Sequence, residues 1–249
     1  MPIRFTPLPA DDGLPLYRAV KRELLAAVQD GRLPPGATLP SEAPLAAAFG
    51  VAIGTLRQAV GELVAEHVLL RRQGRGTFVA THSPERFLFQ FFHVERADGH
   101  REAPVVELVS FERGRLDDDA AEALRQRAGD PAWLIENRLQ LQGRAVVHDR
   151  LQLPQSLYRG LTEKRFRERT GTIYKLYQDG FGITVLRAQE RARAVAAGRD
   201  SARVLGVSVG TPVLELRRTA LSFGDKPVEY RLSTVLTGVH EYVHTLSRG

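Results

Sequence analysis

The sequence contains no cysteine, one methionine and one tryptophan among its 249 residues. The absence of cysteine excludes disulfides, thiolate metal sites and cysteine nucleophiles. No apolar stretch approaches the roughly 20 residues needed to span a bilayer, and the first residues hold no apolar signal core. We therefore expect a cytoplasmic protein that does not associate with membranes.

Metal and cofactor motifs are also absent from the sequence. None of the seven histidines has metal-ligand spacing, and His240 and His244, although four residues apart, lack a helical context. Gly74 and Gly76 are not followed by a helix, so they do not form a phosphate loop. The aspartates Asp117–Asp119 suit a helix cap better than a metal site. We expect no metal, no cofactor and no catalytic residue.

The chain carries an excess of positive charge, +6 overall with a pI of about 10.0. The excess is spread along the chain: residues 1–80 hold nine basic and seven acidic side chains, and residues 81–249 hold 26 and 22. One local cluster, Arg71, Arg72 and Arg75, lies in a stretch without acidic residues. Such a cluster suits nucleic acid, whereas net charge alone describes a solvated basic surface.

The first 80 residues contain three helical patterns. Apolar residues spaced by four predict a helix over Leu16–Asp30, which Gly31 ends. Ser41 is placed to cap a second helix that ends at Gly50. A third helix is predicted over Gly54–Glu66. Two short helices joined by a glycine-containing turn are typical of a helix-turn-helix, although the pattern also fits a small helical bundle.

Two β-like segments, VLLRR and GTFVA, follow the third helix. Gln73, Gly74 and Arg75 join them, so that the loop projects as a wing. An arginine-rich, glycine-flexible loop suits phosphates or a minor groove. One of Arg71 and Arg72 could instead lie on the outer face of the wing strand. The basic hairpin favours DNA binding over a helical bundle that ends in a hairpin.

From Pro15 to Ala80 the sequence resembles the winged-helix domain of GntR-type regulators. The segments that carry the resemblance are GRLPPGATLPSE, LRQAV from Leu56, and RRQGRGTFVA. The resemblance implies a winged helix-turn-helix DNA-binding domain over residues 1–80, which binds through the SE pair, the third helix and the wing. The implied DNA-binding residues are Ser41, Glu42, Thr55, Arg57, Arg71, Arg72, Gln73, Gly74, Arg75 and Thr77.

Two DNA contacts that are common in this family are absent. Ala43 stands where an arginine usually follows the SE pair, and Ala52-Ile53-Gly54 replaces the usual Ser-Arg-Thr at the start of the recognition helix. The missing hydroxyl removes a helix cap worth about 1 kcal/mol. Arg57 is interpreted as a phosphate or guanine contact, and an intradomain pair with Glu62 or Glu66 is the alternative.

Residues 81–90 form a predicted linker into a second domain over residues 91–249. This domain mixes strand and helix patterns and contains two hairpin signals, a Gln-Gly turn and Gly224-Asp225. Predicted strands cover residues 104–114, 133–141, 145–153, 183–196, 213–223 and 227–236.

Short helices separate these strands. We expect aspartate caps at Asp117–Asp119, for a helix through Ala128, and at Asp200, and a further helix that begins at Thr172. The fold class is therefore α+β, with a winged helix-turn-helix followed by a mainly antiparallel sheet with helices.

This second domain resembles the UTRA effector domain, which has a chorismate-lyase-like fold and defines the HutC branch of the GntR regulators. The resemblance covers residues 88–243 and rests on ENRLQLQGRAVVHDRLQLP, GTIYKLYQDGFGI, ARVLGVSVGTPVLELRR and GDKPVEY. In that family the ligand lies against the sheet. The implied effector-binding residues are Arg138, Gln140, Asp149, Thr172, Tyr174 and Glu229.

Several of these residues have structural alternatives. Arg138 could pair with Asp149 across the hairpin, Tyr174 could belong to the core, and Glu229 could be a solvated strand residue. Gln140 stands where the family often has a second arginine, which argues against a strongly anionic sugar phosphate. One guanidinium and two carboxylates suit a carboxylate or zwitterionic ligand, such as an amino-acid-derived acid.

Three functions compete for this sequence. The first is a ligand-responsive transcription regulator: a homodimeric repressor that binds a double-stranded DNA operator and is released by a small metabolite. The second is a lyase-like enzyme of the C-terminal domain, and the third is a DNA-binding architectural protein without a ligand. Fold alone is a weak guide to function, and the attached DNA-binding domain favours the first.

Overall fold

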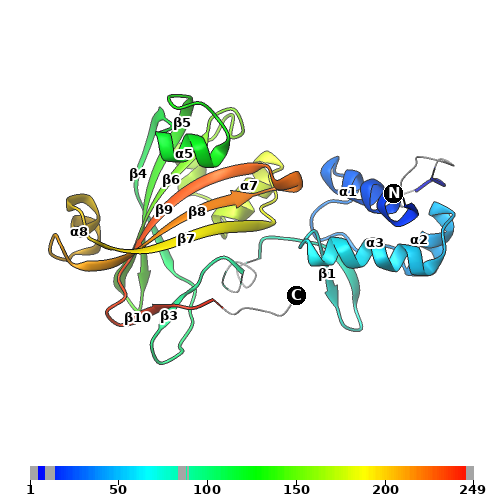
Figure 1. Ribbon diagram of the computed structural model, residues 1–249, viewed down its shortest axis with the longest axis horizontal. Coiled ribbons are helices and arrows are strands. Elements are labelled where there is room, and N and C mark those ends of the chain that lie inside the picture. The colour runs from blue at the N-terminus through cyan, green and yellow to red at the C-terminus, as the bar shows by residue number, and fades with distance from the viewer. Residues whose placement is uncertain (1–4, 9–14, 84–87, 89, 245–249) are drawn as a thin grey trace. The chain divides into compact units, whose positions relative to one another are not determined.

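The computed structural model describes residues 5–8, 15–83, 88 and 90–244 (Figure 1). The chain divides into two compact units between Thr81 and His82. The first unit holds three helices, α1 Leu16–Gln29, α2 Glu42–Phe49 and α3 Ile53–Ala65. No single helix in the described part of the chain has the length and hydropathy of a membrane span; α2 and α3 reach both only when joined, and they are bent by 105° at their junction.

The helices of the first unit pack through the faces that their apolar spacing predicts. Val20 and Leu24 of α1 are buried, as are Leu56 and Leu63 of α3. The helix α2 ends where Gly50 adopts a left-handed φ of 68°, a conformation that glycine takes at no steric cost. The predicted helix-turn-helix is confirmed.

The wing is a hairpin of β1 Leu69–Arg72 and β2 Gly76–Val79. Residues 36–39 run along its second strand, because the amide of Gly36 donates to the carbonyl of Val79 at 3.0 Å and the amide of Leu39 donates to that of Thr77 at 2.8 Å. These bonds fix the wing to the loop between α1 and α2.

The second unit is built on a six-stranded antiparallel sheet with the strand order β4-β5-β6-β9-β8-β7 (Figure 1). The hairpins β5–β6 and β8–β9 coincide with the two hairpins expected from the sequence, and the predicted α+β class is confirmed. The six strands are β4 Val105–Arg115, β5 Pro131–Leu141, β6 Arg144–Pro154, β7 Arg187–Ala196, β8 Pro212–Leu221 and β9 Pro227–Val235.

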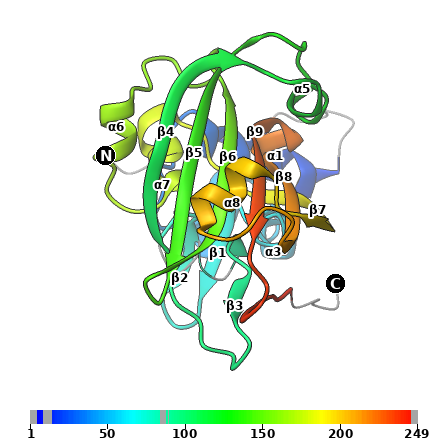
Figure 2. The same ribbon diagram turned by 90° about the vertical axis from the view of Figure 1, so that its left-hand side faces the viewer.

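Helices cover both faces of this sheet (Figure 2). One face carries the main core, where Ile135 and Leu139 of β5 pack with α6 Glu163–Arg167 and α7 Ile173–Phe181. The opposite face packs against α5 Asp118–Leu124 and α8 Arg199–Leu205. A short helix, η1 Phe223–Asp225, lies in the β8–β9 turn. Alternating residues of one strand therefore face different surroundings.

Several element boundaries differ from the sequence predictions. The helix α5 ends at Leu124 rather than Ala128, because Arg125 adopts a left-handed φ of 54°. Gly198, not Asp200, is the N-cap of α8, and Asp200 lies in its first turn. The strand β7 begins at Arg187, four residues later than expected.

Three short elements were not expected from the sequence. The helix α6 has five residues, and β3 Val94–Arg96 pairs with β10 His240–Tyr242 as a separate two-stranded sheet. A three-residue strand is too short to show alternation, so its pairing depends on tertiary contacts.

Candidate functional site

The exposed start of α3 is the first part of a candidate DNA interface. Ile53 and Arg57 are exposed there, and Thr55 is half-buried. Ala52 occupies the N-cap position and makes no side-chain hydrogen bond, as expected for a residue without a hydroxyl. The surface at this helix start is therefore formed by one aliphatic side chain, one hydroxyl and one guanidinium.

Arg57 pairs with Glu42, not with Glu62 or Glu66, which were the alternative to a DNA contact. Its Nε donates to Oε2 of Glu42 at 2.6 Å, and both side chains are open to solvent. Glu62 and Glu66 instead accept hydrogen bonds from Nζ of Lys21, at 2.7 and 2.6 Å. Because an exposed ion pair contributes at most about 1 kcal/mol, Arg57 can exchange Glu42 for a phosphate at little cost.

The wing presents three exposed cations. Among the residues that the structure describes, none forms an ion pair with Arg71, Arg72 or Arg75, and all three are exposed. The guanidinium of Arg72 lies 5.3 Å from the centre of the Phe78 ring, so this arginine is partly oriented by stacking. Gly74 at the tip has a φ of 69°, which lets the turn stay tight.

The other predicted DNA-binding residues lie at the start of α2 and in the wing. Ser41 is exposed at the N-cap position of α2, but its side chain makes no capping hydrogen bond. Gln73 is exposed beside Gly74, and Thr77 is half-buried in β2. The predicted set thus lies at three places in one unit: the start of α2, the start of α3 and the wing.

A cavity of about 200 Å³ lies on the face of the large sheet that carries the main core. Its walls are mostly aliphatic, and its polar groups come from β5, β6, β9 and the chain before α7. The residues that line it are Ala103, Pro104, Val106, Asn137, Leu139, Asp149, Arg169, Gly171, Thr172, Ile173 and Arg231.

Arg231 is the centre of a buried ion cluster on the cavity wall. Its Nη1 donates to Oδ2 of Asp149 at 3.1 Å, and its Nε and Nη2 donate to the two carboxylate oxygens of Glu229 at 3.0 and 3.1 Å. Burial disfavours the charge, but the two carboxylates outweigh burial and hold the pKa of Arg231 well above its usual value. Ser233 donates to Oδ1 of Asp149 at 2.5 Å.

Tyr174 and Glu229 hold this cluster through buried hydrogen bonds. The hydroxyl of Tyr174 donates to Oε1 of Glu229 at 3.3 Å, and that of Tyr177 donates to Oε2 at 2.6 Å. Burial raises the pKa of Tyr174 to about 12, so this hydroxyl stays protonated at neutral pH. Because Tyr174 and Glu229 are both fully buried, they position Arg231 and do not line the cavity; the alternative of a solvated Glu229 is wrong.

Thr172 has two roles at the start of α7. It lines the cavity, and its Oγ1 accepts a hydrogen bond from the amide of Lys175 at 3.1 Å, which makes it the N-cap. A ligand that contacts Thr172 would therefore contact the first turn of α7.

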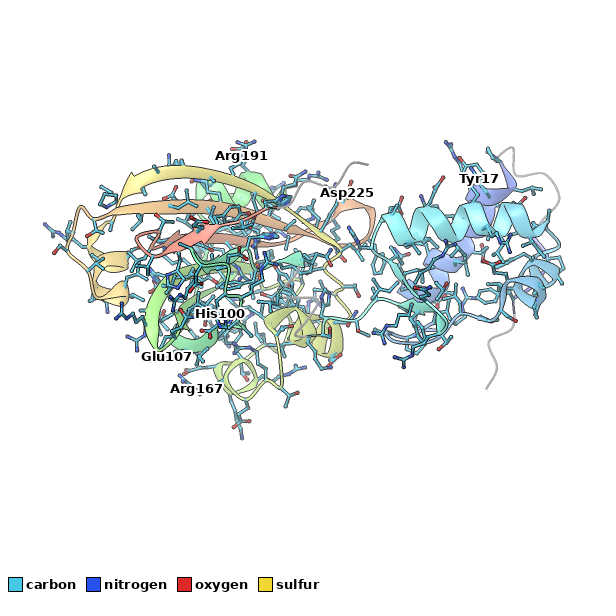
Figure 3. The ribbon with its side chains drawn as sticks, turned by 90° about the horizontal axis from the view of Figure 1, so that it is seen from below. Tyr17, His100, Glu107, Arg167, Arg191 and Asp225 are labelled. Atoms are coloured by element: carbon cyan, nitrogen blue, oxygen red, sulfur yellow. The ribbon has the colours of Figure 1, made fainter. Side chains whose placement is uncertain are left out.

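Arg138 and Gln140 lie on the other face of the sheet, which corrects their assignment to the cavity. Strand alternation places Arg138 opposite the face of Asn137 and Leu139. Both predicted residues donate to Oε2 of Glu107 on β4, Arg138 through Nη2 at 2.5 Å and Gln140 through Nε2 at 3.2 Å (Figure 3 labels Glu107). Arg138 faces His148 across the hairpin rather than Asp149, so the alternative pairing with Asp149 is also wrong.

Three polar residues of the cavity were missed from the sequence: Asn137, Arg169 and Arg231. Arg231 could have been found, because it lies two residues after Glu229 on one strand and therefore shares its face. To predict that Asn137 lines the cavity, one must know which residues of β5 face the core. Arg169 precedes α7 in an irregular segment, where no periodic pattern gives the direction of a side chain.

Comparison with known proteins agrees with this architecture. Residues 16–79 match the family of bacterial regulatory proteins of the gntR type, and residues 100–237 match the UTRA domain. The transcriptional repressor NagR of Bacillus subtilis is 27% identical over 238 residues, which cover 94% of this chain and 96% of NagR. A transcriptional regulator of Mycobacterium tuberculosis is 30% identical over 230 residues, 87% of this chain and 80% of that protein.

A solved structure extends the comparison to the second unit. The ligand-binding domain of a GntR-family transcriptional regulator from Bordetella bronchiseptica is similar with a TM-score of 0.59 and 31% identity, over 64% of this chain and 99% of that domain. Both units thus match the two parts of one kind of regulator. The chain belongs to the GntR family of DNA-binding transcription regulators, in the HutC branch whose members carry a UTRA effector domain.

Proposed function

We propose that this protein is a homodimeric repressor that binds a palindromic operator and is released when a small molecule enters the cavity of its UTRA domain. Relatives at 27% and 26% identity are named repressors, among them NagR and the mannosyl-D-glycerate system repressor MngR of Escherichia coli. A two-fold dimer reads a palindrome with one head on each half-site. Such a repressor acts in the cytoplasm, where the bacterial chromosome lies.

The observation that carries this proposal is the basic wing. Three exposed arginines, Arg71, Arg72 and Arg75, lie on the β1–β2 hairpin without acidic partners among the described residues. Bound phosphates would supply the missing counter-charge. The start of α3 contributes a further guanidinium at Arg57 and two side chains, Ile53 and Thr55, that suit a thymine methyl and a base edge.

The cavity supports the second half of the proposal. Its acidic group, Asp149, already accepts hydrogen bonds from Arg231 and Ser233, which favours binding over proton transfer. We therefore propose that the protein binds its effector without converting it. The effector shifts the regulator only if it binds the released state more tightly than the operator-bound state.

Replacing one wing arginine tests this function. An operator selected from a random pool of duplexes is titrated with the wild type and with Arg75→Ala, and we expect the substitution to weaken binding about tenfold or more, because a charge-assisted bond to phosphate is worth about 1.5–3 kcal/mol. Arg191→Ala is the matched control, since Arg191 is exposed on β7 of the other unit (Figure 3). Equal affinities of Arg75→Ala and the wild type would remove the wing from the interface.

A further inference from the structure

Two buried polar atoms on the cavity wall have no hydrogen-bond partner among the described residues. They are Nε of Arg169 and Oδ1 of Asn137. Native proteins satisfy nearly all such atoms, so an unsatisfied atom of a residue that lines a cavity calls for a partner there, either a water or a ligand. Nε of Arg169 is a donor on a cationic group and Oδ1 of Asn137 is an acceptor. A ligand that satisfies both must therefore supply an acceptor to Arg169 and a donor to Asn137.

Arg169 is oriented toward the cavity by its neighbours but is not neutralised by them. Its Nη1 donates to the carbonyl of Phe166 at 2.6 Å, and its guanidinium lies 4.5 Å from the centre of the Phe166 ring. Burial lowers its pKa, and no ion pair with a described acid offsets that burial. A guanidinium held in this way suits an incoming carboxylate.

Asn137 lies beside the carboxylate of Asp149. The two residues are direct partners in the β5–β6 register and share one face of the sheet, which brings their Cβ atoms to about 5 Å of each other. An unpartnered carbonyl oxygen next to a carboxylate forms an acceptor pair. Such a pair recognises a cationic donor, and an ammonium group supplies both the charge and more than one N–H.

The site has one region with a net negative charge and one with a positive charge. Arg231 with Asp149 and Glu229 forms a cluster of one cation and two anions, whereas Arg169 is a separate cation. Pro104, Val106 and Leu139 add aliphatic walls. A ligand that is cationic at one end, anionic at the other and apolar between them fits all three features.

We infer that the effector is a small zwitterion of the aliphatic amino-acid type, with its carboxylate on Arg169 and its ammonium group on Asn137 and Asp149. This inference rests on the proposed function, because it takes the cavity as the effector site. It gives Arg169 the role that the sequence assigned to Arg138. It also distinguishes the ligand from a simple organic acid, which would leave the acceptor pair without a donor.

Four matched ligands test the class. Leucine carries both charges; 4-methylpentanoate lacks the donor; 2-hydroxy-4-methylpentanoate replaces the ammonium with a hydroxyl; and leucinamide lacks the carboxylate. Binding to the full-length protein is measured by calorimetry at constant ionic strength. We expect leucine to bind at least tenfold more tightly than each of the other three. Equal binding of 4-methylpentanoate, or no binding of leucine, overturns the inference.

Two variants locate the contact. Arg169→Met is expected to lose at least tenfold in leucine affinity while its thermal midpoint without ligand changes little, because the loss of the bond to the Phe166 carbonyl is offset by the removal of the unsatisfied Nε–H group. Arg167→Met is the control: Arg167 projects from α6 (Figure 3), where it pairs with Glu163 at 2.7 Å, and its leucine affinity should not change. Unchanged leucine affinity in Arg169→Met, or a large loss of its stability, shows that Arg169 is structural.

Operator binding by the same proteins without ligand keeps the two proposals apart. If the wild type and Arg169→Met bind the selected operator equally, the proposed repressor function stands whatever the ligand titrations show. If the wild type binds leucine as expected but selects no operator, the zwitterion site stands and the repressor function fails.

Discussion

Glu229 connects three side chains from two elements through one buried carboxylate. Each of its oxygens accepts from Arg231 on the same strand, and the hydroxyls of Tyr174 and Tyr177 on α7 complete the set. All four groups are buried. At such a site the removal of one partner leaves the others desolvated, and this cost exceeds the value of the bond itself.

Glu229→Gln therefore tests the supporting role of this carboxylate. We expect it to lower the free energy of unfolding by about 3–5 kcal/mol, because Arg231 keeps its buried charge and loses one of its two counter-charges. Denaturant titration followed by circular dichroism measures the change. Glu163→Gln is the control, since Glu163 pairs with Arg167 in solvent, and it should stay within about 0.5 kcal/mol of the wild type. Similar stabilities of the two variants would contradict a structural role for Glu229.

At the scale of elements, the sequence patterns predict the hairpins, but they do not always predict on which face of the sheet a side chain lies. The alternation in β5 and β6 locates both strands, and the Gln-Gly turn locates their connection. The predicted face of Arg138 was wrong, because alternation along β5 places its neighbours Asn137 and Leu139 on the cavity face and Arg138 on the opposite face. Arg169 could not be predicted, because its direction depends on the packing of its guanidinium on Phe166.

The helix α7 depends on a cap that also belongs to the cavity. Thr172→Ala should destabilise the protein by about 0.5–2 kcal/mol, because the amide of Lys175 loses its acceptor. Thr172→Ser keeps the oxygen and should recover most of the stability. Thermal unfolding of the three proteins measures both effects. If the serine variant is no more stable than the alanine variant, the stability that Thr172 contributes comes from its methyl group and not from the cap.

At the scale of the whole molecule, the two units match different parts of the family: the first matches the gntR DNA-binding domain and the second the UTRA domain. The first unit presents exposed arginines that have no acidic partner among the described residues, and the second holds a cavity lined by two residues whose polar atoms lack a partner in the same part of the chain. The composition and motifs predict this division, because the basic stretch without acids and the hairpin signals lie in different parts of the sequence. The assembly of two copies on one operator is a proposal that the dependence of binding on salt can test.

Each phosphate contact that an arginine makes contributes about 0.9 to the slope of log affinity against log salt. If a homodimer places one Arg75 on each half-site, Arg75→Ala should reduce the slope by about 1.8 on a full palindrome and by about 0.9 on a single half-site. Light scattering should give about 55 kDa, twice the chain mass of 27.6 kDa. A reduction of only about 0.9 on the full palindrome, together with a monomer mass, would contradict the dimer and leave the wing contact in place, because one head would then account for all of the binding.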